Sequence, residues 1–127
     1  MKIRIKGNSI RYRLTQTEVK TLAETGYLSE ETCFGPEASQ KFFYTLEAKT
    51  GIDGLRAAFD GGTISLFIPA EAARTWLEEE RVGFANGVEV APGITLHLLL
   101  EKDFACLDDS QEDQSDNFPN PNAVCNV

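Results

Sequence analysis

Residues 2–14, KIRIKGNSIRYRL, constrain the fold most, because a single strand pairing sorts all of their side chains by polarity. If facing residue numbers add to 15, Ile5 faces Ile10 and Ile3 faces Tyr12 on one side of an antiparallel hairpin. Residues 6–9 supply Gly and Asn, which tolerate the left-handed backbone of a tight turn. The other side of this predicted hairpin carries only bases: Lys2, Arg4, Arg11 and Arg13.

The same pattern returns 54 residues later, in LRAAFDGGTISLFI at residues 55–68. It places Phe59 opposite Ile64 and Ala57 opposite Leu66, around a turn of the same length with glycine at the same position. Few residues are identical at this offset, so a repeat is supported by the shared pattern and not by sequence identity. We predict a tandem ββαββ duplication, with halves at residues 1–49 and 55–103.

Each predicted hairpin leads into a helix. Thr15 and Glu18 have the spacing of a capping box, and Gly26 is suited to a left-handed C-cap, so the first helix is expected at residues 16–25. In the second half Pro69 suits a helix start, and a helix is expected from Ala70 to residue 79 or 80.

The remaining apolar stretches have the composition of strands. The Asn86-Gly87 pair is a hairpin signal that competes with a single strand there, and the repeat favours the single strand with a turn at residues 91–93. We predict an α+β fold, with a mainly antiparallel sheet of about seven or eight strands and both helices on one apolar face. The four further strands are expected at residues 27–34, 41–48, 82–90 and 94–103.

Length and charge limit the organisation and the partners. A chain of 127 residues fits a single domain, here residues 1–104, followed by an acidic arm rich in Pro and Asn at residues 105–127. The net charge is −8, yet residues 1–14 carry five bases and no acid, and residues 104–127 carry five acids and no base. An acidic protein lacks the general attraction to phosphates that nucleic-acid binding requires, so nucleic acid is not an expected partner.

The chain offers no run of apolar residues for a signal peptide or a membrane span, which favours a cytoplasmic protein. Three cysteines without a short spacing favour reduced thiols. Two alternatives remain open: a disulfide between Cys106 and Cys125, or a zinc site formed by these two cysteines and His97.

Three stretches together resemble a bacterial family of small proteins known only as a domain of unknown function. They are the opening KIRIKGNSIRYRLTQTEV, the segment VGF at residues 82–84, and the ending EKDFACL followed by ED, D and FPNP. The resemblance covers nearly the whole chain. It implies that residues 101–121 belong to the domain, and it implies no catalytic residue.

The predicted architecture is also similar to that of the triphosphate-tunnel (CYTH-like) enzymes, which use bases for phosphates and acids for a metal. That family opens with alternating glutamates, whereas this chain has Lys2, Arg4 and Lys6 at those positions. The resemblance implies an alternative function, a metal-dependent phosphohydrolase. The acids that could hold its metal are Glu47, Glu101 and Asp103.

The four bases of the first hairpin are the candidate anion-binding residues, because like charges facing each other across strands require compensation. Acids on neighbouring strands, such as Glu47 or Glu101, could neutralise them. A bound anion could do so instead, since arginine binds carboxylate and phosphate with two hydrogen bonds. We therefore predict a binding domain for an anionic small molecule or an acidic protein segment. One candidate segment is the protein's own acidic arm, anchored by Phe118 and its prolines.

Overall fold

The computed structural model describes residues 1–104 and 116–119. These residues form eight strands, two α-helices and two short 3₁₀ turns, as the α+β prediction requires. In chain order the elements are β1 Lys2–Lys6, β2 Ser9–Leu14, α1 Gln16–Thr25, β3 Tyr27–Cys33, a 3₁₀ turn Ala38–Gln40, β4 Lys41–Lys49, β5 Arg56–Asp60, β6 Thr63–Pro69, α2 Ala70–Thr75, a 3₁₀ turn Trp76–Glu78, β7 Gly83–Ala91 and β8 Ile94–Lys102.

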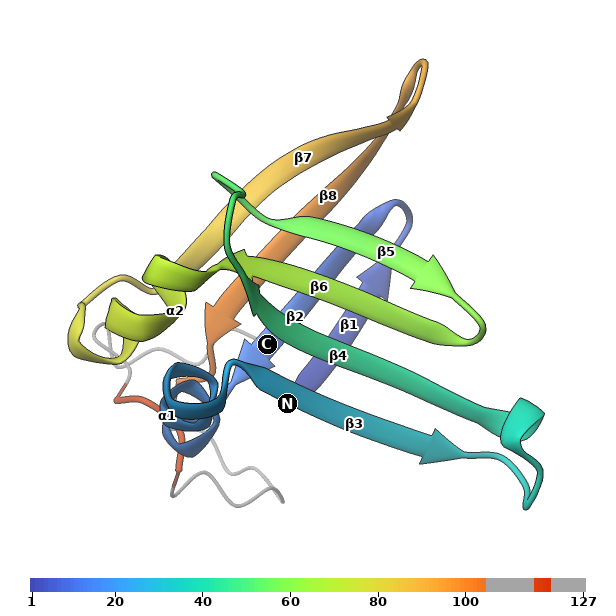
Figure 1. Ribbon diagram of the computed structural model, residues 1–127, viewed down its shortest axis with the longest axis horizontal. Helices are drawn as coiled ribbons and strands as arrows, with labels where there is room; N and C mark the ends of the chain where they lie inside the picture. Colours follow the sequence, from blue (N-terminus) through green and yellow to red (C-terminus); the bar gives the residue numbers. More distant parts are fainter. Residues whose placement is uncertain (105–115, 120–127) are drawn as a thin grey trace.

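The strands form two four-stranded sheets, sheet A with the order β1-β2-β8-β7 and sheet B with the order β3-β4-β6-β5 (Figure 1). Four of the strand pairings are antiparallel, while β2 pairs with β8 and β4 pairs with β6 in parallel. The division into two mixed sheets differs from the single sheet expected from the sequence. Neither parallel pairing has a local sequence signal, because the paired strands belong to different halves of the chain.

The two halves are equivalent in topology. Tyr12 on β2 pairs with Leu100 on β8, and the residues 54 positions away, Leu66 on β6 and Leu46 on β4, pair in the same way. Each sheet therefore takes one hairpin from each half. The equivalence agrees with the predicted repeat in element order and register, and a duplication as the origin of the two halves stays a prediction.

Both hairpin registers agree with those expected from the sequence. Ile5 pairs with Ile10 and Phe59 with Ile64. In the second half the Asn86-Gly87 pair lies inside β7, and the chain turns between Ala91 and Ile94. The repeat therefore predicted this turn better than the hairpin signal.

Helix α1 has the predicted bounds. The Thr15 side chain accepts from the Glu18 amide, the Glu18 carboxylate accepts from the Thr15 amide, and Gly26 closes the helix with φ of 76°. Helix α2 is shorter than expected and passes into the 3₁₀ turn at Trp76. The indole of Trp76 is buried and donates to the carbonyl of Arg81 at 2.9 Å, which fixes the chain after this turn.

The hydrophobic core lies between the two sheets and the helices. Buried side chains alternate with more exposed ones along β2, β6 and β8, so one face of each sheet points inward. Among the described residues, no helix is long and apolar enough to cross a membrane. The buried apolar side chains are Tyr12, Leu14, Val19, Leu22, Leu46, Leu55, Ile64, Leu66, Ile68, Ala73, Trp76, Leu98, Leu100 and Phe118.

Residues 116–119 pack on the body formed by residues 1–104. Phe118 is 9% exposed, forms a bridge with Phe104, and donates its amide to the carbonyl of Asp103 at 2.7 Å. The two rings meet edge to face, with centroids 5.9 Å apart. The sequence predicted Phe118 as an apolar anchor of the acidic arm. In the structure Phe118 contacts residues at the end of β8 and just after this strand.

Candidate functional site

The outward side of the β1–β2 hairpin carries the basic residues, and we call it the basic face. Lys2 pairs with Arg13 and Arg4 pairs with Arg11, as the sequence predicted. Strand alternation puts Lys6 on the same side. The basic face thus consists of Lys2, Arg4, Lys6, Arg11 and Arg13.

Strand β8 brings a carboxylate to the basic face. The parallel pairing sets Glu101 beside Arg13, on the side of the sheet that bears the arginines. Its Oε1 lies 2.9 Å from Nε of Arg11 and 3.9 Å from Nε of Arg13. Nε of Arg11 and this oxygen are both buried atoms that lack a well-aligned hydrogen bond within the described residues, so they attract each other by charge alone. Glu101 therefore compensates two arginines with one oxygen.

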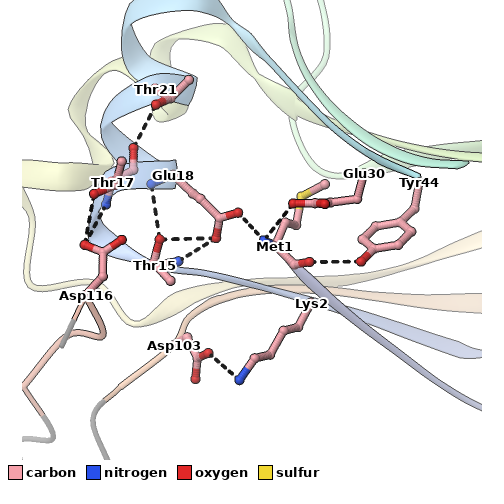
Figure 2. Close-up of polar contacts among 10 residues, drawn as sticks. All are labelled: Met1, Lys2, Thr15, Thr17, Glu18, Thr21, Glu30, Tyr44, Asp103 and Asp116. Atoms are coloured by element: carbon pink, nitrogen blue, oxygen red, sulfur yellow. Dashed lines mark hydrogen bonds and ion pairs between the residues drawn. The ribbon is translucent and has the colours of Figure 1, made fainter. Parts of the chain in front are cut away.

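A second carboxylate lies at the Lys2–Arg13 end of the basic face (Figure 2). Nζ of Lys2 lies 3.3 Å from Oδ2 of Asp103, which is buried. Arg4 and Lys6 are exposed, and neither forms an ion pair with another residue described here. Compensation by acids is therefore concentrated at the Lys2, Arg11 and Arg13 positions.

The three predicted metal ligands are not gathered at one place. Glu47 is exposed on β4 of sheet B, whereas Glu101 and Asp103 lie on and after β8 of sheet A. Residues 1–104 and 116–119 contain no cluster of three or more His, Cys, Asp or Glu side chains that could hold a metal ion. His97 is exposed on β8 opposite Ser9, and Cys106 and Cys125 lie outside the described residues.

Asp116 belongs to the acidic arm and contacts α1, not the basic face (Figure 2). Its carboxylate accepts from the Thr17 hydroxyl at 3.0 Å and from the Thr17 amide at 3.3 Å. The hydroxyl of Thr15 is the main cause of the lowered pKa of Asp116, and these two Thr17 donors lower it further against the effect of desolvation. Asp108, Asp109, Glu112 and Asp113 lie outside the described residues, so their docking on the basic face stays a prediction.

A polar cluster at the start of the chain was not expected from the sequence (Figure 2). The amino group of Met1 forms ion pairs with Glu18 and, at 3.3 Å, with Glu30. The Tyr44 hydroxyl donates to the Met1 carbonyl at 3.0 Å. Burial, and then the charges of Glu30 and Glu18, raise the pKa of Tyr44. Sequence reasoning used Glu18 only as a capping residue.

Lys102 is a buried base that sequence reasoning also missed. Its side chain is in contact with the rings of Trp76 and Phe118, and Nζ donates to the carbonyl of Glu79 at 2.6 Å. Burial lowers the pKa of Lys102, and the charge of Glu79 partly opposes this effect. A signal was present, because Lys102 continues the inward-facing series of Leu98 and Leu100 at a spacing of two.

An open cleft of about 600 Å³ is a further site that the sequence did not reveal. It lies where the residues before β5 meet the start of α2 and the first part of β7. The Asn86 side chain bridges two of these segments, accepting from the Leu55 amide at 2.8 Å and donating to the Leu55 carbonyl at 3.0 Å. The charged residues that line the cleft are Asp53, Arg56, Glu71 and Arg81.

These features define a small α+β protein with two equivalent ββαββ halves. Each half contributes one hairpin to each of the two sheets, and sheet A carries the basic face. The chain belongs to the Family of unknown function (DUF7009), whose model matches residues 1–122. The match extends past Phe118, in keeping with the packing of this residue against the body of the protein. No curated protein and no solved structure matches the chain.

Proposed function

We propose that the protein is a non-enzymatic binding domain whose basic face receives an anionic partner. The observation that carries this proposal is the unequal charge of the face. Glu101 and Asp103 compensate Lys2, Arg11 and Arg13, while Arg4 and Lys6 are exposed beyond these ion pairs. Anionic oxygen atoms would find uncompensated donors at this end of the hairpin.

The strand pairing supports the proposal because it holds the charges close together. Arg4 and Arg11 are cross-strand partners, and such pairs have Cβ atoms about 4.5–5.5 Å apart. Like charges at this separation are destabilising, so an anion that contacts both guanidinium groups removes a repulsion in addition to forming new hydrogen bonds. The expected partner is an anionic small molecule or an acidic protein segment.

The protein's own acidic arm remains one such segment under this proposal. Asp116 is already engaged by Thr17, so an internal partner would have to come from acids before it in the chain. Exposed ion pairs contribute only about 0–1 kcal/mol each, so an external polyanion could displace such a segment. We place the binding in the cytoplasm, in line with the three cysteines, of which Cys33 is a free exposed thiol.

The test is isothermal titration with inorganic tripolyphosphate and, separately, with an oligoglutamate peptide. Arg4→Gln removes an exposed charge without an ion pair in the described part of the chain, so folding should be retained. We expect this variant to bind about fivefold more weakly, as the loss of about 1 kcal/mol implies. Lys20→Gln, which removes an exposed charge on α1, is the matched control and should bind as the original chain does.

The dependence of anion affinity on salt concentration is a second test of the basic face. Screening shortens the range of these charges to about 10 Å at about 0.1 M ionic strength, so affinity should decrease as salt rises, and Arg4→Gln should show a weaker dependence. Equal affinities of the Arg4→Gln and Lys20→Gln proteins for both probes would contradict the proposal.

The phosphohydrolase predicted as an alternative needs a metal held by carboxylates. Two of its candidate ligands, Glu101 and Asp103, lie against the cations Arg11 and Lys2, and Glu47 is on the other sheet. This placement favours a binding domain. Release of phosphate from tripolyphosphate in the presence of Mg²⁺, abolished by Glu101→Ala, would support the enzyme instead.

A further inference from the structure

We propose that the cleft between β5, α2 and β7 is a second binding site, for an organic monocarboxylate with an apolar body. This site is independent of the basic face, because it belongs to residues 53–87 and includes no residue of the first hairpin. Its volume of about 600 Å³ lies within the usual range for small-molecule sites, about 300–1,000 Å³.

A comparison of the two halves shows that the cleft is apolar where the first half carries acids. Leu55, Ala72 and Phe84 line it, and 54 positions earlier the chain has Met1, Glu18 and Glu30. Those three residues are in contact in the first half, where the two glutamates bind the amino group of Met1. The second half has apolar side chains in place of both acids. A surface that receives a cation in one half is therefore apolar in the other.

The two halves also differ in charge at the rim of the cleft. Arg81 occupies the position equivalent to Tyr27, so the second half has a cation where the first half has a phenol. Its guanidinium lies over the Phe84 ring, 4.0 Å from the centroid, and its Nε donates to the Gly83 carbonyl at 2.9 Å. These contacts orient the guanidinium group, and its two terminal nitrogens have no hydrogen bond within the described residues. They are available to a carboxylate, which they can bind with two hydrogen bonds.

The other charges limit the ligand to a single negative charge. Arg56 is already paired with Asp53 at 3.0 Å, and it also donates to the Leu55 carbonyl. Glu71 lines the cleft as well and would repel a phosphate dianion more strongly than a carboxylate. Arg81 is thus the cation that a ligand can neutralise, while Leu55, Ala72 and Phe84 offer apolar contact to the rest of the ligand.

The experiment is a titration of the full chain followed by amide chemical shifts, with 3-phenylpropionate, its neutral amide 3-phenylpropanamide, and inorganic phosphate. We expect 3-phenylpropionate to shift the amides of Gly54, Phe84 and Gly87, and to bind at least about tenfold more tightly than the neutral amide. Phosphate should leave these amides unchanged, even if it shifts those of the basic face. That separation keeps a failure here distinct from a failure of the proposed function.

Two pairs of variants test the roles of Arg81 and Ala72. Arg81→Gln should weaken 3-phenylpropionate binding at least about tenfold, whereas Arg74→Gln, on α2 outside the cleft lining, should not change it. Ala72→Glu introduces the acid that the first half has at the equivalent position and should abolish binding, while the uncharged Ala72→Gln should retain more of it. Ala72 is not fully buried, so both variants are expected to fold.

The proposal is overturned if 3-phenylpropionate shifts none of the cleft amides, if its amide binds equally well, or if Arg81→Gln binds like Arg74→Gln. A well-dispersed spectrum of each variant shows that it is folded.

Discussion

The hydroxyl of Tyr12, on β2 of sheet A, donates to the carbonyl of Ile64, on β6 of sheet B, at 3.2 Å. Both residues are buried, and the rings of Tyr12 and Tyr44 meet edge to face with centroids 6.0 Å apart. This hydrogen bond joins the two sheets at the centre of the core. Burial raises the pKa of Tyr12, against the effect of a hydrogen bond at the Thr45 backbone.

The buried phenol should make the protein sensitive to alkali. A raised pKa in the folded state means that only the unfolded chain loses the Tyr12 proton just above about pH 10. The free energy of unfolding should therefore fall as the pH rises above about 10, and urea titrations at several pH values will measure it. In Tyr12→Phe this part of the fall should be absent, with a loss of about 1 kcal/mol at neutral pH. An unchanged pH profile would contradict the role of Tyr12.

The capping box of α1 should contribute measurably to stability. Thr15→Ala removes the acceptor for the Glu18 amide, and N-cap substitutions of this kind cost about 1 kcal/mol. Thr21→Ala is the control, because that hydroxyl only donates to the Thr17 carbonyl on the exposed side of the same helix. We expect thermal denaturation to show a lower Tm for Thr15→Ala and little change for Thr21→Ala. Equal changes would mean that the cap is not the cause.

Phe118 should behave as a core residue although 14 positions of sequence separate it from Phe104. Phe118→Ala should destabilise the protein by about 3 kcal/mol, as loss of a buried ring does. Phe59→Ala removes a ring that is 72% exposed at the β5–β6 hairpin and should change stability by less than about 0.5 kcal/mol. Urea denaturation of both variants measures the difference. Similar small losses would show that residues 116–119 are not part of the cooperative fold.

Gly83 should tolerate no side chain. A Cβ there would lie 2.2 Å from the carbonyl oxygen of Leu100 and 3.0 Å from Cα of Glu101, which are backbone atoms of β8. We expect Gly83→Ala to cost about 1–3 kcal/mol, measured by chemical denaturation, because the strands must separate. Gly87→Ala is the comparison on the same strand, since its closest contact is the Thr95 methyl group at 3.0 Å. A side-chain atom can move, so a cost at Gly87 equal to that at Gly83 would contradict this explanation.

The sequence by itself determined the local structure. Alternation of apolar and charged residues, with Gly and Asn in the turn, determined the register of Lys2–Leu14, because a shift by one residue would place isoleucines opposite arginines. The capping box and Gly26 determined both ends of α1 in the same way. These signals work because each involves neighbours within one hairpin or one helical turn.

Only the tertiary structure decided how the halves combine and where the sites lie. Nothing local indicates that β2 pairs with β8, and this pairing is what brings Glu101 to Arg11 and Arg13. The cleft that contains Arg56 and Arg81 likewise forms only when the start of β5 meets β7. The physical reason is that pairing between distant strands depends on which arrangement buries the apolar faces of both sheets at once, a property of the whole chain and of no single segment.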